Sequence, residues 1–189
     1  MRVAVVGMGL MGSNHLRVLG RVADAEVVGV CDPVVSLPEG IAAYRDLDSL
    51  IENAAPEAAV VAVPTSAHYD VCKRLLTAGI HLLIEKPAAV TSAEARELAA
   101  VADRHSARAC VGHVERFNPV IQALQRELGD TRILSISFTR VGDMPPRVVD
   151  VGVLVDLGVH DIDLLRFITA SAIVSATVYS SSTTDSGIE

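Results

Sequence analysis

Uninterrupted apolar runs alternate with amphipathic helical patterns through the first part of the chain. The runs lack the polar residue at every second position that marks a half-solvated strand, so we expect buried parallel strands covered on both sides. The predicted strands are RVAVVG (2–7), EVVGVCD (26–32), AAVVAVP (58–64), IHLLIEKP (80–87) and RACVGH (108–113). The predicted helices begin near Leu10 and cover 47–53, 66–79 and 91–105. This order predicts an α/β fold with a doubly wound parallel sheet.

The pattern changes past the last of these strands. Within 114–128 a helix is predicted with Pro119 near its first turn, and alternating segments follow at 132–142 and 173–180. Alternation predicts strands buried on one face, so we expect a second domain with a sheet of its own. We assign 1–118 to the first domain and 119–189 to the beginning of the second. Because two strands do not form an independently stable sheet, we expect either a piece of a longer protein or an unusually small second domain.

One more helix, VDLGVHDIDLLRF (155–167), is predicted between the two alternating segments and carries three acid-base residues. Asp156, His160 and Asp163 stand at i, i+4 and i+7, so they form one polar stripe, which apolar columns flank on both sides. We expect a mostly buried helix that presents this stripe to a cleft, with the Asp156 carboxylate fixing the His160 tautomer. The alternatives are a divalent metal site, for which one helix offers an incomplete ligand set, and a buried structural polar network.

Composition narrows the class of partner. The 189 residues carry a formal net charge of −7, which argues against a nucleic-acid or anionic membrane surface and favours a small-molecule partner. No apolar run reaches the roughly 20 residues that span a bilayer. The three cysteines, Cys31, Cys72 and Cys110, are widely spaced and form no CxxC or metal motif. We therefore expect free thiols in a reducing compartment, and a cytoplasmic location.

The first candidate site follows the first predicted strand. GMGLMG places Gly7, Gly9 and Gly12 before a helix, where glycines allow a tight turn, close approach of a pyrophosphate and close helix packing. Asp32 ends the second strand twenty positions later (32 − 12 = 20), where a carboxylate binds a ribose 2′-hydroxyl. A carboxylate repels a 2′-phosphate, and no Arg or Lys follows directly, so NAD is favoured over NADP. The alternatives are purely structural glycines and a turn residue before Pro33.

A second candidate lies at the end of a predicted buried strand, in Glu85, Lys86 and Pro87. Ligands of open α/β sheets bind outside the carboxyl ends of the strands, so Lys86 should point into the cofactor crevice, where an ammonium stabilises an alkoxide. The alternative is an ordinary surface ion pair. His15 and His68 also lie near this edge and are candidates for cofactor contact. The remaining histidines outside the acid-base stripe, His81, His105 and His113, are interpreted as structural or exposed.

Five motifs in order, GMGLMGSNHL, VPTSAHYD, LLIEKP, GHVERFNP and DLGVHDIDLL, resemble the glucose-fructose oxidoreductase, inositol dehydrogenase and rhizopine catabolism family (Gfo/Idh/MocA). The resemblance implies a Rossmann domain followed by an α/β domain with an open, mostly antiparallel sheet that often forms an oligomer interface. It therefore implies a homo-oligomer. The family normally continues well beyond the last residue of this sequence, so we expect an incomplete second domain.

The resemblance also implies roles for individual residues. Lys86 is similar to the catalytic or substrate-orienting lysine, and His160 to the general base with Asp156 as its partner. Arg116 and Asn118 resemble substrate-side residues. The implied cofactor contacts are the glycines Gly7, Gly9 and Gly12, together with Leu10, Met11, Asp32, Pro64, Thr65, His68, Glu85 and Lys86. No metal is implied.

These expectations converge on an NAD-dependent oxidoreductase that transfers hydride from a secondary hydroxyl of a sugar, cyclitol or nucleotide sugar to nicotinamide. GHVERFNP most resembles members that oxidise the C3 hydroxyl of UDP-N-acetylglucosamine. Two other functions stay open. One is an NAD-binding sensor without turnover, and the other is a glycosidase that uses bound NAD transiently.

Overall fold

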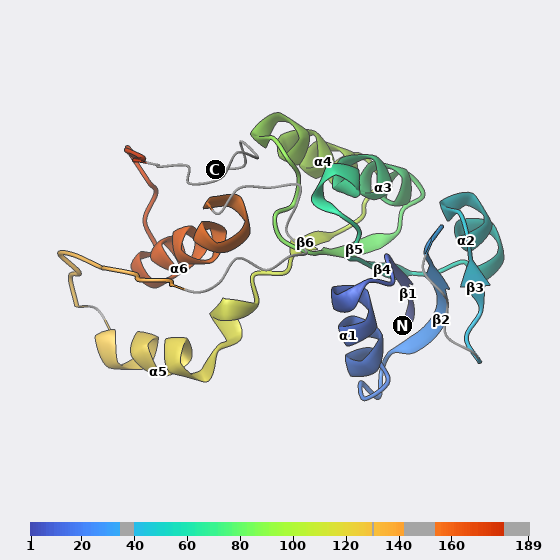
Figure 1. The fold of residues 1–189 in the computed structure, drawn as a ribbon, viewed down its shortest axis with the longest axis horizontal. Helices are drawn as coiled ribbons and strands as arrows, with labels where there is room; N and C mark the ends of the chain where they lie inside the picture. Colours follow the sequence, from blue (N-terminus) through green and yellow to red (C-terminus); the bar gives the residue numbers. More distant parts are fainter. Residues whose placement is uncertain (35–39, 130, 142–153, 180–189) are drawn as a thin grey trace. The chain divides into compact units, whose positions relative to one another are not determined.

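The computed structural model of the chain describes residues 1–34, 40–129, 131–141 and 154–179. It divides into two compact units, a first unit Met1–Gly112 and a second unit His113–Glu189, and each is described by itself (Figure 1). The sequence analysis placed the domain boundary after residue 118. Among the described residues, no helix is long and apolar enough to span a membrane.

The first unit is built on a six-stranded sheet in which every paired strand is parallel, as predicted. The strand order is β3-β2-β1-β4-β5-β6. The strands are β1 Arg2–Val6, β2 Glu26–Cys31, β3 Ala43–Tyr44, β4 Ala58–Val61, β5 His81–Ile84 and β6 Ala109–Val111. Strand β3 was not predicted, because a strand of two residues carries no periodic pattern.

Helices cover both faces of this sheet. Helix α1 (Leu10–Leu19) lies on one face, and α2 (Leu47–Ala54), α3 (Thr65–Thr77) and α4 (Ser92–Arg104) lie on the other (Figure 1). Along β1, Val5 belongs to the small cluster against α1, whereas Ala4 and Val6 belong to the large cluster on the opposite face. The split follows from strand geometry, because successive side chains point to opposite faces.

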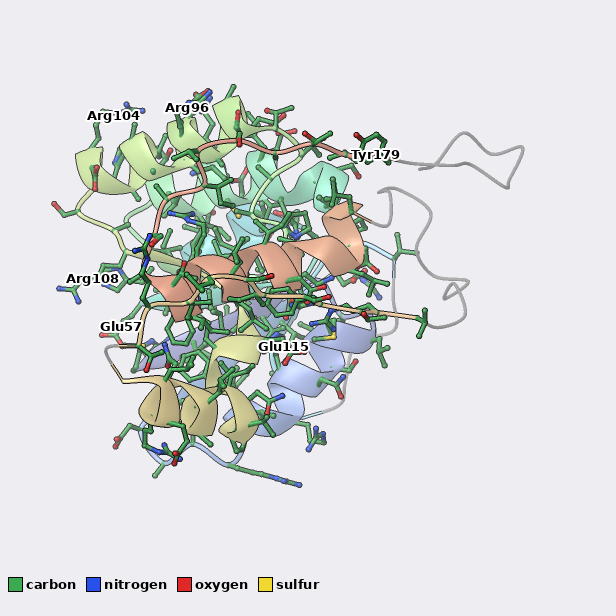
Figure 2. All side chains as sticks on the ribbon, turned by 90° about the vertical axis from the view of Figure 1, so that its left-hand side faces the viewer. Glu57, Arg96, Arg104, Arg108, Glu115 and Tyr179 are labelled. Carbon is green, nitrogen blue, oxygen red and sulfur yellow. The ribbon has the colours of Figure 1, made fainter. Side chains whose placement is uncertain are left out.

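Local signals determine where the helices begin and end. Thr91 caps α4 in a capping box, in which Thr91 Oγ1 accepts the Glu94 N–H at 3.2 Å and the Glu94 carboxylate accepts the Thr91 N–H at 2.9 Å. From the same helix, Leu98 is buried in the core, while Arg96 and Arg104 project away from it (Figure 2). Gly79 follows α3 with a φ of +78°, a conformation that favours glycine.

The regular secondary structure in the described part of the second unit is helical. It contains a 3₁₀ turn η1 (Val114–Phe117), helix α5 (Pro119–Leu128), a π-turn η2 (Leu154–Gly158) and helix α6 (Val159–Thr169). The helix predicted with Pro119 near its first turn is confirmed as α5, and the 3₁₀ turn η1 precedes it. Pro119 explains where α5 begins, because a proline disfavours helical backbone in the residue before it, and Asn118 has an extended ψ of 125°.

The strands predicted over 132–142 and 173–180 are not formed in the described residues 132–141 and 173–179. The prediction of an open, mostly antiparallel sheet in this unit is accordingly not met by the described residues. A strand exists through hydrogen bonds to a neighbouring strand, and neither segment has one among these residues. Gly142 and Ser180, at the ends of the two predictions, lie outside the described residues.

The prediction of one buried α-helix over 155–167 is also corrected. Asp156 lies in the π-turn η2, whereas His160 and Asp163 lie in the α-helix α6, so the predicted helix is formed by two kinds of turn. The apolar flanks are not enclosed within the described chain either, because Ile162 keeps 42% of its surface exposed. The sequence pattern predicted one regular helix, and it carried no signal for the π-turn.

We predict that Gly12→Ala destabilises the protein, because a Cβ at Gly12 would lie 1.8 Å from the Gly7 carbonyl oxygen. Backbone atoms cannot rotate away as a side chain does, so we expect a loss of at least about 2 kcal/mol in the free energy of unfolding. Denaturant titration measures it. Gly20→Ala is the matched control, because Gly20 has a helical φ of −62° and its Cβ would make only ordinary contacts. Equal stability of the two variants would contradict the packing argument.

Candidate functional site

The three glycines around the turn between β1 and α1 are needed for different reasons. Gly7 has a φ of +90°, and a Cβ there would lie 2.6 Å from the backbone of Ala62 after β4. A Cβ at Gly12 would strike Gly7 itself. At Gly9, by contrast, a Cβ would meet nothing within 4 Å. Protein packing therefore explains Gly7 and Gly12, whereas Gly9 faces open space in which a ligand can approach the backbone.

This open space lies at the N-terminus of α1. Gly9 is the N-cap of that helix, and no side chain caps it. Leu10 and Met11 in the first turn are 62% and 39% exposed. Backbone N–H groups and the helix dipole make such a terminus favourable for an anion. The sheet order also reverses beside it, between β1 and β4, which is where ligands of doubly wound sheets bind.

Asp32 stands next to the glycine turn, directly after β2. Its carboxylate accepts the Met8 N–H on Oδ2 and the Val34 N–H on Oδ1, both at 2.8 Å. The side chain is thus held in place beside the loop that carries Gly9. Arg45, which the sequence analysis did not consider, donates from Nη1 to the Asp32 carbonyl oxygen at 3.0 Å. It follows β3, the strand that the sequence pattern missed.

Lys86 lies after β5, as predicted, and is half-buried. Its neighbour Glu85 is buried, and the Glu85 N–H donates to the Val61 carbonyl at 2.9 Å. Glu85 Oε1 lies 2.7 Å from Nε2 of His15 on α1. Burial pushes the pKa of Glu85 upward, but the hydrogen bond and charge of His15, with the Lys86 backbone N–H and ammonium, outweigh it and lower the pKa. The Lys86–Pro87 peptide bond is cis.

The segment before α3 contains three further predicted cofactor contacts. Pro64 is the N-cap of the helix, and Thr65, its first residue, is buried. The resemblance implied a cofactor contact for His68, and the structure leaves 1% of its surface exposed. Its Nδ1 lies 2.7 Å from the Pro87 carbonyl oxygen and its Nε2 lies 3.0 Å from that of Val63. The ring is therefore enclosed between two backbone carbonyls.

The cysteines of the first unit's core are unsuited to nucleophilic chemistry. Burial is the main cause that raises the pKa of Cys31 to about 11, with further contributions from Asp46 and Asp32. Burial also raises the pKa of Cys72 to about 12. Both thiols thus stay protonated near neutral pH, and a protonated thiol is a poor nucleophile.

In the second unit, Asp163 is the centre of a buried ionic cluster. Arg116 donates to it from two nitrogens, with Nε 2.8 Å from Oδ2, and also stacks on the Phe167 ring at 5.2 Å. Nε2 of His113 lies 3.7 Å from Asp163 Oδ1. Burial favours a higher pKa for Asp163, but the bonds from Arg116 and the charges of His113, Arg116 and Arg166 lower it. The third residue of the predicted stripe is therefore structural.

Two predicted substrate-side residues are engaged within the second unit. Arg116 binds Asp163, as described above. Asn118 caps α5 by accepting the Val120 N–H on Oδ1 at 3.0 Å, and it donates from Nδ2 to Glu115 at 3.2 Å. Direct substrate contact by these two side chains stays a prediction.

Asp156 and His160, the predicted acid-base pair, lie in η2 and in the first turn of α6, and both are half-buried. Their pairing also stays a prediction. In the Asp163 cluster, burial, together with Arg116, lowers the pKa of His113 despite the opposing charge of Asp163.

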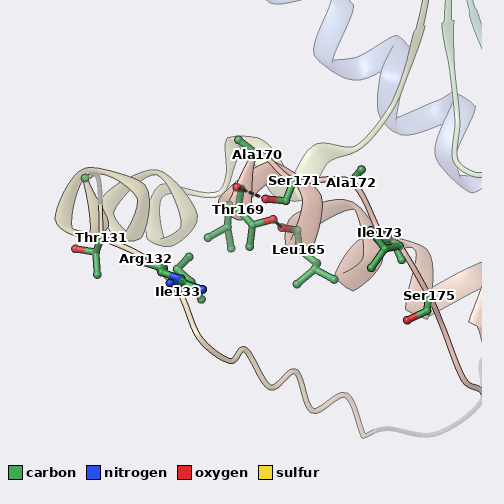
Figure 3. A pocket seen from close by; sticks show the side chains of 13 residues that line it. Thr131, Arg132, Ile133, Leu165, Thr169, Ala170, Ser171, Ala172, Ile173 and Ser175 are labelled. Carbon is green, nitrogen blue, oxygen red and sulfur yellow. Dashed lines mark hydrogen bonds between the residues drawn. The ribbon is translucent and has the colours of Figure 1, made fainter.

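The second unit also has an open cavity of about 690 Å³ between the end of α5, the end of α6 and the segments that follow them (Figure 3). Its lining includes Ile133, Leu165, Ile168 and Ile173 and contains none of the predicted catalytic residues. Within the described part of the chain, no group of three His, Cys, Asp or Glu residues is placed to hold a metal ion.

Comparison with known proteins links these features to a family. Residues 1–113 match the model of the Gfo/Idh/MocA oxidoreductase family with an NAD-binding Rossmann fold. The chain is 30% identical over 200 residues to the rhizopine catabolism protein MocA of Rhizobium meliloti, a match that covers 98% of the chain and 62% of the relative. It is 32% identical over 178 residues to UDP-N-acetylglucosamine 3-dehydrogenase of Acidithiobacillus ferrooxidans, covering 90% and 55%.

A solved structure agrees with these matches. GenD2 from gentamicin A biosynthesis, in complex with NAD, is 25% identical with a TM-score of 0.75, over 89% of this chain and 53% of that one. The chain therefore spans a little over half the length of the proteins that it matches. Together with the glycine turn, Asp32 and Lys86, the family match over residues 1–113 shows that the chain belongs to the Gfo/Idh/MocA family of NAD-binding oxidoreductases.

Proposed function

We propose that the protein is an NAD-dependent dehydrogenase that oxidises a secondary hydroxyl of a sugar, cyclitol or nucleotide sugar. The observation that carries this proposal is the open space in front of Gly9, at the point where the sheet order reverses. It accommodates a ligand close to the backbone, and Lys86 follows β5, the strand beside β4. The comparisons support the reaction class, because the matched relatives include a dehydrogenase of a nucleotide sugar.

The first unit's residues fit a dinucleotide. Gly9, Leu10 and Met11 form the helix terminus that would receive the pyrophosphate. Asp32 would accept hydrogen bonds from ribose hydroxyls, and Pro64 and Thr65 would lie beside the nicotinamide ribose. Bound NAD supplies the acceptor for a hydride, which no protein side chain provides.

His160 and Lys86 would carry the proton chemistry. We assign to His160 the acceptance of the proton from the substrate hydroxyl, because an imidazole exchanges protons efficiently near neutral pH. The Lys86 ammonium would stabilise the negative charge that develops on the same oxygen. Asp156 would hold the His160 ring in the tautomer that leaves the accepting nitrogen free toward the substrate. We assign no proton transfer to Glu85, because its lowered pKa makes its carboxylate a weaker base.

For the substrate, we propose a nucleotide sugar oxidised at C3, as in UDP-N-acetylglucosamine. The support is the resemblance of GHVERFNP (112–119) to members that act on such sugars and the 32% identity to the Acidithiobacillus enzyme. Arg116 and Asn118 of this segment would shape the site by holding η1 on α6 and capping α5. We further propose a homo-oligomer formed through the second domain.

The cofactor assignment predicts a selective effect of Gly9→Ala. A Cβ at Gly9 meets no protein atom within 4 Å and the residue has a φ of −68°, so stability should not change. The same Cβ would occupy space that a pyrophosphate needs, and we expect the Kd for NAD to rise about tenfold or more. Calorimetric titration measures the Kd, with Gly20→Ala as the control. Unchanged NAD affinity in Gly9→Ala would exclude this placement of the pyrophosphate.

The preference for NAD over NADP is predicted to rest on Asp32. Asp32→Asn removes the charge that repels a 2′-phosphate, and Arg45 stands beside this position. We expect the ratio of the two dissociation constants to move toward NADP by about tenfold. Titrating both dinucleotides into the wild type, Asp32→Asn and the double variant with Arg45→Ala measures the ratio. A wild type that binds NADP as tightly as NAD would refute the assignment.

The catalytic assignment predicts that Lys86→Ala and His160→Ala each lower kcat by about a hundredfold or more while NAD still binds. The assay uses protein expressed from its complete gene with NAD and a panel of sugars, inositol and UDP-N-acetylglucosamine, and follows reduced-nicotinamide absorbance. His105→Ala, at an exposed residue of the first unit, is the control. NAD binding without turnover of any compound would instead favour the sensor, or the glycosidase if a glycoside is cleaved.

A further inference from the structure

We propose that His15 and His68 are positioning residues for Lys86: each holds one of the two residues that flank it, and together they determine where its ammonium stands. The proposal rests on the role of Lys86 proposed above. It also gives His68 a different task from the cofactor contact that the sequence suggested.

His15 holds the residue before Lys86. It belongs to α1, and its Nε2 lies 2.7 Å from Glu85 Oε1 in a pair whose side chains are only 20% and 11% exposed. The other carboxylate oxygen, Oε2, accepts the Lys86 backbone N–H at 3.3 Å. The Glu85 N–H is meanwhile bonded to Val61 on β4. One buried carboxylate therefore links the helix that begins at Gly9 to the backbone of Lys86.

His68 holds the residue after Lys86. From α3, it places Nδ1 at 2.7 Å from the Pro87 carbonyl oxygen and Nε2 at 3.0 Å from the Val63 carbonyl oxygen. Carbonyls only accept hydrogen bonds, and an imidazole donates from one nitrogen when neutral and from both when protonated. The proposal therefore requires a proton on Nδ1, which ties the loop of Lys86 to α3, in a site with 1% exposure.

The two histidines come from the two helices whose N-termini are assigned to the cofactor. Helix α1 begins next to Gly9, and α3 begins at Thr65. The contacts of the two histidines with Glu85 and Pro87 would therefore oppose a movement of Lys86 relative to the dinucleotide. Rate is very sensitive to such placement, because a shift of about 1 Å costs on the order of a hundredfold.

The environment of the Lys86 side chain can be measured directly, because Lys73 and Lys86 are the only two lysines of the sequence. Reductive methylation with isotope-labelled formaldehyde gives each a separate NMR signal. Lys73 serves as an internal reference, since it lies on α3 and bonds to Tyr69 and Glu97 on the exposed side. Neither bond involves the proposed histidines.

We expect His15→Ala and His68→Gln to shift the Lys86 signal and leave the Lys73 signal in place. His15→Gln keeps a donor near Nε2, so its Lys86 signal should lie closer to that of the wild type than the signal of His15→Ala does. His68→Asn keeps a donor near Nδ1, so its Lys86 signal should likewise lie closer than that of His68→Gln. His105→Ala is the control. A Lys86 signal that is unchanged in both His15→Ala and His68→Gln would overturn the proposal. Equal movement of both lysine signals would also overturn it, because it marks a general loss of structure.

Measurements of kcat and KM distinguish a failure of this proposal from a failure of the proposed function. In His15→Ala, we expect kcat to fall about tenfold or more, with less than about a twofold change in KM for NAD and recovery in His15→Gln. If Lys86→Ala leaves turnover intact, the proposed catalytic role of Lys86 is wrong, while the NMR signals still report whether the histidines position it. A parallel rise in KM and loss of stability, without recovery in His15→Gln, would mean that His15 supports only the fold.

Discussion

Gly7 and Gly12 pack backbone against backbone in the first unit, and much of the candidate site depends on this contact. No side chain fits there, because even a methyl group at Gly12 would lie 1.8 Å from the Gly7 oxygen. The contact brings α1 against the end of β1 and turns its N-terminus toward the switch in strand order. It also fixes the position of His15, about one and a half turns into the helix, from which the side chain reaches Glu85.

Among the described residues, each unit contains a buried carboxylate that pairs with a cation or a histidine. In the first unit Glu85 is paired with His15, and in the second Asp163 is bound by Arg116 through two nitrogens. Removing a carboxylate from water is unfavourable, so each pair persists only because its hydrogen bonds replace those of water. The two carboxylates are similar in chemistry but differ in context. Glu85 adjoins the proposed catalytic lysine, whereas Asp163 holds a 3₁₀ turn onto a helix.

The structure distinguishes polar residues that can contact a ligand from polar residues that bind other parts of the protein. His68 and Arg116 belong to motifs that resemble cofactor and substrate segments, yet both make their described contacts to other protein groups. Residues of this kind are expected around a reacting centre, because a catalytic side chain needs neighbours that limit its freedom. Motif resemblance identifies the neighbourhood of a site, and the contacts then distinguish the residues that support it.

The sequence by itself determined the parallel sheet, the four helices that pack on it and the place of the glycine turn, Asp32 and Lys86. These follow from local periodicity and from the spacing of Gly7, Gly9 and Gly12, which depend on residues close together in the chain. The sequence also indicated the family. It did not determine the π-turn before His160, the strand Ala43–Tyr44 or the fate of the alternating segments at 132–142 and 173–180.

Only the tertiary structure decided which polar groups pair. Glu85 meets His15 seventy positions earlier, and Asp163 meets Arg116 forty-seven positions earlier. No periodic pattern connects residues so far apart, since their meeting depends on how strands and helices are stacked. For the same reason, a histidine enclosed by two carbonyls and a histidine open to a ligand look alike in the sequence. The difference between them lies in burial and in the direction of the ring, which are properties of the folded chain.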